Sequence, residues 1–164
     1  MEKLKDVLIK YLTETVREVK KRASNGDGRE ILGEVINRPE DVEIGIDRVG
    51  EDILERLLKE SQIKATIYSE PEGRDIENGN DFYGAIDPFD GSALFLRGFE
   101  HNWYTALSFY DENKKPIATG IADILNEKFY IMNSGHTYLF DQKTGRKKDI
   151  SPSKRKKLSE PIVL

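Results

Sequence analysis

The residues best suited to chemistry lie in the stretch 87–92, which reads Asp-Pro-Phe-Asp-Gly-Ser and holds two carboxylates three residues apart. The preceding segment 81–86 is aromatic and apolar, and it predicts a buried strand that ends at Asp87. Because proline has no N–H and a fixed φ, Pro88 is expected to stop the strand pairing and let the two carboxylates converge. A short helix predicted over 92–97 would add free backbone N–H groups beside them. This corner suits a hard divalent cation together with a phosphate.

The same stretch also has a purely structural interpretation. Asp-Pro and Asp-Gly are ordinary turn dipeptides, and Asp90 or Ser92 could simply cap the following helix. Taken alone, the stretch favours this turn interpretation, so the rest of the chain must decide between the two.

The elements that would position this corner follow from the hydrophobic pattern. Apolar residues at helical spacing predict an amphipathic helix over 2–22 and a second helix over about 49–60. Between them, residues 29–44 have no clean period and are expected to form a mobile, irregular segment. Two helices followed mostly by antiparallel strands predict an α+β fold with the helices packed on the sheet. The runs typical of strands are 63–68, 103–110, 116–122, 127–132 and 137–140.

Length and composition limit the class of protein. The 164 residues, of which 37% are hydrophobic, are enough for one core. We assign 1–150 to one α+β domain and 151–164 to a basic linker and the start of a missing C-terminal domain. The absence of cysteine excludes disulfides, thiolate metal sites and cysteine nucleophiles. No apolar run reaches membrane-spanning length and no signal-peptide core is present, so a cytoplasmic location without a membrane partner is expected.

Charge is distributed unevenly along the chain. The net charge is −4, yet the segment 143–157 holds eight basic residues and one acidic residue. This segment has no interleaved aromatic residues and contains glycine, serine and proline. A solvated hairpin and linker are therefore favoured, and nucleic acid is not expected as a partner.

Three motifs, in this order, resemble those of the inositol monophosphatase and fructose-1,6-bisphosphatase superfamily, which contains Mg²⁺-dependent, lithium-sensitive sugar phosphatases. The signature Asp-Pro-Ile/Leu-Asp-Gly-Thr/Ser of that family appears at 87–92. Its upstream Asp-x-x-Thr-x-x-Asp-Arg stretch with a nearby glutamate corresponds to 41–48 and Glu51. Its Glu-Glu pair after a strand corresponds to Glu70 and Pro71. The resemblance extends from the upstream stretch to the end of the chain and implies the N-terminal half of the layered sugar phosphatase fold.

The resemblance implies a set of metal ligands. A first metal would be held by Glu70, Asp87 and the main-chain carbonyl of Phe89. A second metal would bridge Asp87 and Asp90, polarise the phosphate ester and stabilise the leaving oxygen. The implied cofactor is Mg²⁺, with two or more ions in the complete enzyme.

The resemblance also implies how a phosphate ester would be attacked. Water on the first metal would attack phosphorus in line, while Asp47 and Ser92 accept its proton as a relay. By the same resemblance, Glu70 is a catalytic residue as well as a metal ligand. Backbone N–H groups of Gly91 and Ser92 would hold the phosphate oxygens. For Asp47, the structural alternative is that it merely caps the second helix.

Some positions depart from the family pattern. Ser92 keeps the hydroxyl of the commoner threonine, whereas proline in place of the second glutamate removes a carboxylate that a weakly held further metal would use. The departing residues are Ile44, Pro71, Phe89 and Ser92.

One expected ligand is missing from the sequence. The family has a further aspartate for the second metal in a Trp-Asp motif, but the only tryptophan here, Trp103, is followed by tyrosine. His101 and His136 are expected to be structural or exposed because magnesium prefers oxygen ligands.

We therefore expect a Mg²⁺-dependent phosphatase that hydrolyses a sugar or inositol phosphate monoester by metal-activated water, incomplete in this chain, so that the isolated chain has weak or no turnover. The alternative is a non-catalytic module that binds metal or phosphate, or mediates oligomerisation. A small-molecule phosphate ester is the expected partner, and homodimer formation is a family expectation.

Overall fold

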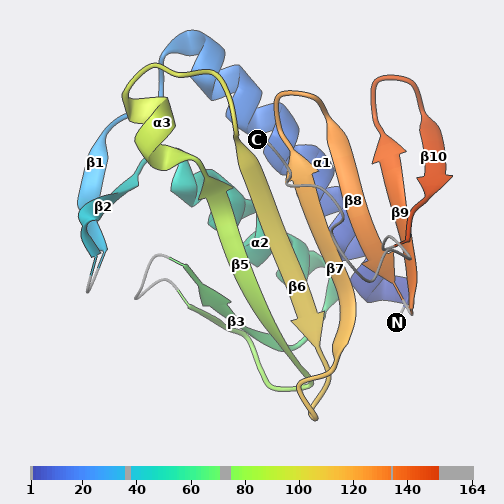
Figure 1. The fold of residues 1–164 in the computed structure, drawn as a ribbon. Coiled ribbons are helices and arrows are strands. Elements are labelled where there is room, and N and C mark those ends of the chain that lie inside the picture. Colours follow the sequence, from blue (N-terminus) through green and yellow to red (C-terminus); the bar gives the residue numbers. More distant parts are fainter. Residues whose placement is uncertain (1, 36–37, 71–74, 134, 152–164) are drawn as a thin grey trace, which may run out of the picture.

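The computed structural model describes residues 2–35, 38–70, 75–133 and 135–151, and Figure 1 shows the course of the chain. Two long helices are present, as the hydrophobic period predicts: α1 (Glu2–Asn25) and α2 (Asp47–Ser61). Apolar side chains that recur every three to four residues give α1 one fully buried face. Within the described ranges, no helix is both long and apolar enough to cross a membrane.

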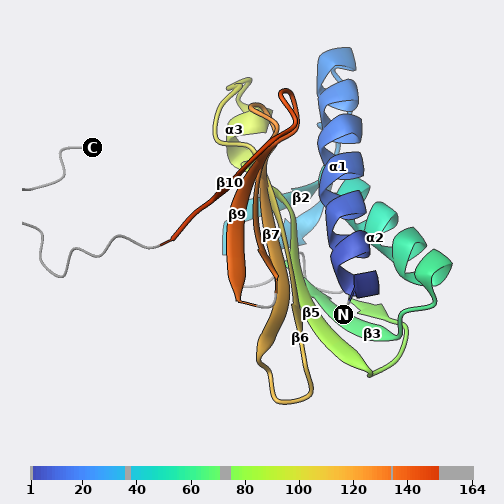
Figure 2. The same cartoon turned by 90° about the vertical axis from the view of Figure 1, so that its right-hand side faces the viewer.

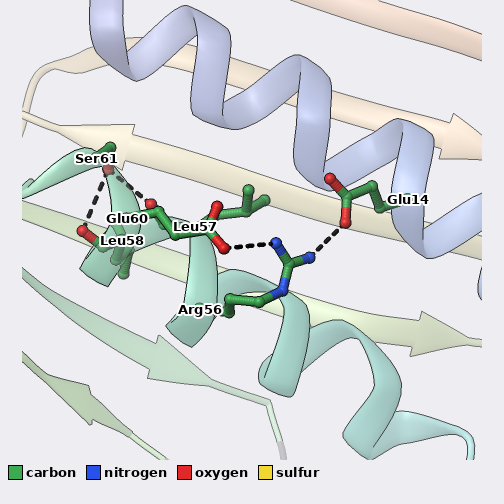
Figure 3. A network of polar contacts seen from close by, with 6 residues as sticks. All are labelled: Glu14, Arg56, Leu57, Leu58, Glu60 and Ser61. Carbon is green, nitrogen blue, oxygen red and sulfur yellow. Dashed lines mark hydrogen bonds and ion pairs between the residues drawn. The ribbon is translucent and has the colours of Figure 1, made fainter.

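Arg56 connects the two helices on their solvent side (Figure 3). Its guanidinium forms an ion pair with Glu14 of α1 and a second one, at 3.1 Å, with Glu60 of α2. At the end of α2, the Ser61 hydroxyl oxygen lies 2.7 Å from the Leu57 carbonyl oxygen, within the last turn. The polar faces of α1 and α2 are thus joined through one arginine.

Eight strands form one mixed sheet in the order β10-β9-β8-β7-β6-β5-β3-β4. Neighbouring strands are antiparallel except β3 and β5, which run parallel. A short helix, α3 (Ser92–Leu96), connects β5 to β6. The strands of this sheet are β3 (Ala65–Ser69), β4 (Ile76–Glu77), β5 (Phe82–Asp90), β6 (Tyr104–Tyr110), β7 (Pro116–Asp123), β8 (Lys128–Asn133), β9 (His136–Asp141) and β10 (Arg146–Asp149).

Both long helices lie on the same face of this sheet (Figure 2). A glycine allows α1 to come close: a Cβ added to Gly120 of β7 would lie 2.7 Å from Leu12 Cδ1 and 3.1 Å from Leu8 Cδ1. The core lies between the helices and the sheet, where Leu107 and Phe109 of β6 are fully buried. The predicted α+β fold, with two N-terminal helices packed on a mostly antiparallel sheet, is confirmed.

The prediction for residues 29–44 was wrong. This segment forms an antiparallel pair, β1 (Ile31–Val35) and β2 (Arg38–Ile44). Two register shifts, one before Gly33 and one before Val35, interrupt the pairing. Each shift changes which residues face the same side, so the strand period of two is lost from the sequence.

The basic segment contributes the edge strand β10, which pairs with β9 as a hairpin whose β10 side chains are exposed. This agrees with the solvated hairpin that the sequence favours. From residue 152 onward, the basic segment and the expected linker lie outside the described residues, as does Pro71.

Candidate metal and phosphate site

Two predicted site residues directly follow the last residue pair of the ladder between β3 and β5. In the parallel ladder of β3 and β5, Ser69 lies opposite Ile86, and the Glu70 N–H donates to the Ile86 carbonyl at 2.9 Å. Because parallel strands present their carboxyl ends at the same edge of a sheet, Glu70 and Asp87 start from adjacent backbone positions. Glu70 is exposed and Asp87 is half-buried.

The strand β5 does not end at Pro88, contrary to the prediction. It continues to Asp90, which pairs with Tyr104 of β6, whereas Asp87 pairs with Ala106. Two residues of β5 therefore lie opposite the single residue Thr105, which is the geometry of a β-bulge. The proline is accommodated in the bulge, where a missing N–H breaks no regular ladder bond.

The turn after the bulge depends on Gly91. Its φ is 125°, and an added Cβ would lie 2.7 Å from the Asn102 carbonyl oxygen and 3.2 Å from Trp103 Cδ1. Only glycine fits both this φ and this close approach. Gly91 is the N-cap of α3 and makes no side-chain cap, so neither Asp90 nor Ser92 occupies the capping position considered from the sequence.

Asp47 and Ser92 lie in direct contact. The Ser92 hydroxyl oxygen lies 3.0 Å from Asp47 Oδ1 and 3.0 Å from the Phe89 carbonyl oxygen. The second oxygen of Asp47 accepts a hydrogen bond of 2.7 Å from the Ile44 N–H. Asp47 is the first residue of α2, but its carboxylate bonds to the end of β2 and to Ser92. Asp47 therefore connects α2 to the end of β2 and to the start of α3.

The environment of Asp47 raises the pKa of its carboxyl group to about 7. Burial is the main cause, since the residue is only 4% exposed. The hydrogen bonds from Ile44 and Ser92 act in the opposite direction, while the negative charges of Asp87 and Glu70 raise the pKa further. The Asp47 carboxylate is thus close enough to those of Asp87 and Glu70 to be repelled by both.

An aromatic cluster lies beneath the bulge. The rings of Phe89, Phe95 and Trp103 meet edge to face, with centroids 5.3 to 5.8 Å apart. All three side chains are buried. Edge-to-face contacts of this kind stabilise a fixed arrangement of rings. The larger residue at position 89, a departure from the family pattern, is therefore accommodated by packing against Phe95 of α3 and against Trp103, directly before β6.

The remaining residues singled out from the sequence lie at the surface. Asp90 is exposed at the far end of the bulge, and His101 and His136 are exposed, as expected. In the described part of the chain, no three acidic or histidine side chains are gathered into a ready metal site. The carboxylates of Glu70 and Asp87 nevertheless fit a hard divalent cation in their chemistry, because both place negative charge near the buried Asp47 and a cation would offset it.

Sequence reasoning missed two residues behind the bulge, Thr105 and Tyr11, whose hydroxyl oxygens lie 2.6 Å apart. One signal was available: the buried positions of β6 are Thr105, Leu107 and Phe109, so Thr105 is the only hydroxyl among them. A polar residue at a buried strand position calls for a hydrogen-bond partner.

Comparison with known proteins gives the family. No family model matches the chain. A fructose-1,6-bisphosphatase/inositol-1-monophosphatase of Thermococcus kodakarensis is 30% identical over 116 residues, which are 70% of this chain and 40% of that protein. Among solved structures, an inositol monophosphatase-fructose 1,6-bisphosphatase has a TM-score of 0.67 at 25% identity, over 90% of this chain and 56% of its own. SuhB of Mycobacterium tuberculosis has a TM-score of 0.68 at 20% identity, over 95% and 54%.

The chain is therefore similar to members of the inositol monophosphatase and fructose-1,6-bisphosphatase superfamily, and the resemblance stated from the motifs is confirmed. Its relatives are phosphatases by name, which supports a phosphatase family for this chain. The chain spans about half the length of the solved relatives and 40% of the curated one.

Proposed function

We propose that this chain carries the metal-binding and proton-accepting part of a Mg²⁺-dependent phosphatase that hydrolyses a sugar or inositol phosphate monoester. The observation that carries the proposal is the contact of Asp47 with Ser92 beside the carboxylates of Glu70 and Asp87. The names of the relatives support the substrate class.

The proposed roles of the residues follow from their positions. Glu70 and Asp87, with the Phe89 carbonyl, would hold one Mg²⁺, and Asp87 with Asp90 would hold a second. Bound Mg²⁺ would supply an activated water and positive charge for the phosphate and the leaving oxygen. The N–H groups of Gly91 and Ser92, at the start of α3, would receive phosphate oxygens.

Asp47 would take the proton of the attacking water. A carboxyl group with a pKa of about 7 accepts a proton far more readily than an ordinary carboxylate. The Ser92 hydroxyl has one proton and two acceptors, Asp47 Oδ1 and the Phe89 carbonyl. When Asp47 becomes protonated, it can donate to Ser92, which then donates to Phe89, so the new proton is accommodated without an unpaired donor.

The rival proposal is a non-catalytic module that binds metal or phosphate or forms oligomers, the homodimer among them. Weak or absent turnover by the isolated chain is expected under both proposals, so binding has to be measured before turnover.

The test compares the wild type with Asp90→Asn and Asp47→Asn. Mn²⁺ binding is followed by electron paramagnetic resonance, and phosphate release is followed with Mg²⁺ on inositol phosphate and fructose bisphosphate. We expect Asp90→Asn to weaken Mn²⁺ binding and Asp47→Asn to abolish any release while it leaves Mn²⁺ bound. Asp81→Asn, an exposed carboxylate at the other end of β5, is the matched control.

Two results would separate the proposals. Mg²⁺-dependent phosphate release by the wild type that is lost in Asp47→Asn, with Mn²⁺ still bound, would favour the phosphatase over the binding module. A wild type that neither binds Mn²⁺ nor releases phosphate would refute the phosphatase proposal for this chain.

A further inference from the structure

A buried chain of hydroxyl groups connects α1 to the bulge that carries Asp87. The Tyr11 hydroxyl lies 2.6 Å from Thr105 Oγ1, and Thr105 Oγ1 donates to the Asp87 main-chain carbonyl at 3.2 Å. Tyr11 and Thr105 are both 0% exposed. In sequence, Tyr11 and Thr105 are 94 residues apart, so this contact is a product of the tertiary fold.

The direction of both hydrogen bonds follows from chemistry. A carbonyl oxygen can only accept, so the single proton of Thr105 is committed to Asp87. Tyr11 must therefore be the donor to Thr105. Burial raises the pKa of Tyr11 above its usual value, so this hydroxyl stays protonated and remains a donor. The sequence of donors runs from Tyr11 through Thr105 to Asp87.

The hydroxyl chain ends where the pairing of β5 with β6 is irregular. Regular pairing between β5 and β6 is interrupted between Asp87 and Asp90, and Thr105 is the residue of β6 opposite the interruption. Pro88, inside the bulge, has no N–H to contribute. The Thr105 hydroxyl thus supplies a bond to the Asp87 carbonyl at the position where the ladder becomes irregular.

Close packing of α2 holds the same point from a second side. A Cβ added to Gly50 would lie 2.9 Å from Pro88 Cβ and 3.0 Å from the Tyr11 hydroxyl oxygen. Tyr11, Gly50 and Pro88 therefore meet directly behind the bulge, and α1, α2 and β5 are in contact there. Because the pocket around the tyrosine hydroxyl is this tight, its position is fixed by packing as well as by the hydrogen bond.

We propose that Tyr11, acting through Thr105, is a positioning residue that fixes the backbone at Asp87 and so aims its carboxylate at the metal. Neither residue touches metal or substrate. The inference rests on the proposed function for its metal, but the orientation of Asp87 can be measured in the metal-free protein as well.

The experiment uses Thr105→Val, Tyr11→Phe and the double variant in the full chain. Mn²⁺ affinity is measured by electron paramagnetic resonance. Thr105→Val is expected to weaken it by about tenfold, the lower end of what loss of an outer-shell partner does to metal sites. Tyr11→Phe should weaken it less, and the double variant no more than Thr105→Val alone, because Tyr11 acts only through Thr105. Thr119→Val and Tyr138→Phe, which remove hydroxyls elsewhere on the sheet, should leave it unchanged.

Two further measurements distinguish the loss of positioning from misfolding and from failure of the proposed function. Thr105→Val removes the Thr105 oxygen that accepts from the buried Tyr11 hydroxyl, whereas the double variant removes both groups, so its melting temperature should recover toward that of the wild type. In metal-free samples, the ¹³C carbonyl shift of Asp87 should change in Thr105→Val and in the double variant, but not in the two controls.

The outcomes are distinguishable. Wild-type Mn²⁺ affinity in all three variants, with an unchanged Asp87 carbonyl shift, would overturn the inference. If the wild type itself binds no Mn²⁺, the proposed function fails, and the carbonyl shift alone decides whether the hydroxyl chain fixes Asp87.

Discussion

Ser92 and Asp47 are 45 residues apart in the sequence, yet the serine hydroxyl oxygen lies 3.0 Å from the carboxylate Oδ1. The contact joins the start of α3 to the start of α2 and places both groups beside the strand ends that carry Glu70 and Asp87. A buried carboxylate held by neutral donors, with two other carboxylates nearby, is sensitive to the loss of any one donor.

Replacing Ser92 with alanine should raise the pKa of Asp47 above about 7, because the hydrogen bond from Ser92 is one of the two contacts that lower it. The ¹³C carboxyl shift of Asp47, titrated in metal-free protein, measures this directly. Ser61→Ala, which removes a hydroxyl at the end of α2, should leave the titration as in the wild type. A lower pKa in Ser92→Ala would contradict the assignment of the hydroxyl as a donor to Asp47.

Stability of the metal-free protein should depend on Asp47 in a specific pH range. The folded-state pKa of about 7 exceeds the ordinary aspartate value of 3.8, so the folded protein binds the proton more tightly than the unfolded chain. The stabilising contribution of Asp47 to the free energy of unfolding is therefore completely present below pH 4 and is lost as the pH rises to about 7. The full shift corresponds to roughly 4 kcal/mol.

Urea unfolding of the wild type and Asp47→Asn across this range isolates that contribution, because the asparagine does not titrate. The difference in free energy of unfolding between the two proteins should move in favour of the variant as the pH rises from 4 to 7. A constant difference would show that Asp47 has an ordinary pKa.

Gly50→Ala should destabilise the protein although alanine is the better helix former. The helix-propensity gain is about 1 kcal/mol. The added Cβ would meet the rigid ring of Pro88 at 2.9 Å, and such overpacking usually costs about 1 to 3 kcal/mol. We expect a net loss in thermal unfolding, with little change for Glu55→Ala on the exposed face of α2. A stabilised Gly50→Ala would show that α2 can move away from the bulge.

The aromatic cluster predicts a graded response at Phe89. Phe89→Leu keeps most of the volume and should cost less than about 1.5 kcal/mol of unfolding free energy. Phe89→Ala removes both edge-to-face contacts and should cost about 3 to 5 kcal/mol. Phe99→Ala, at a ring that is 50% exposed, should change the unfolding free energy by about 0.5 kcal/mol or less. Equal losses at Phe89 and Phe99 would argue against a packed cluster.

The Arg56 network on the helices should be weak in spite of its geometry (Figure 3). Arg56 is 45% exposed, and solvent screening limits such pairs to about 1 kcal/mol or less. A double-mutant cycle with Arg56→Ala and Glu14→Ala, measured by urea unfolding, gives the coupling. This coupling free energy should be smaller still at high salt. A coupling of several kcal/mol that persists in high salt would mean that the pair is effectively desolvated.

Several features were predictable from the sequence because they depend on neighbours along the chain. The period of α1 follows from one buried face, and the turn at Gly91 from a glycine before a helix. The strand β5 was predicted at its start but not at its end, since the proline rule assumes a regular ladder and Pro88 lies in a bulge.

The site itself depends on contacts that spacing does not show. The family resemblance placed Asp47 and Ser92 in one site, but their hydrogen bond and the pKa of Asp47 follow only from the packing of α2 against β5. The bond from Tyr11 to Thr105 joins the first helix to β6, and no local pattern connects such distant residues. The roles of these residues in metal binding and catalysis remain predictions.

The close approach of α1 to Gly120 has a consequence for how the protein is made. The helix α1 leaves the ribosome before β7, because the strand that covers Leu8 and Leu12 is synthesised more than 90 residues later. At cellular translation rates this delay is roughly 5 to 20 s. During that time the part of the apolar face of α1 that packs on β7 stays uncovered. Exposed apolar surface of this kind favours chaperone binding and aggregation before folding is complete.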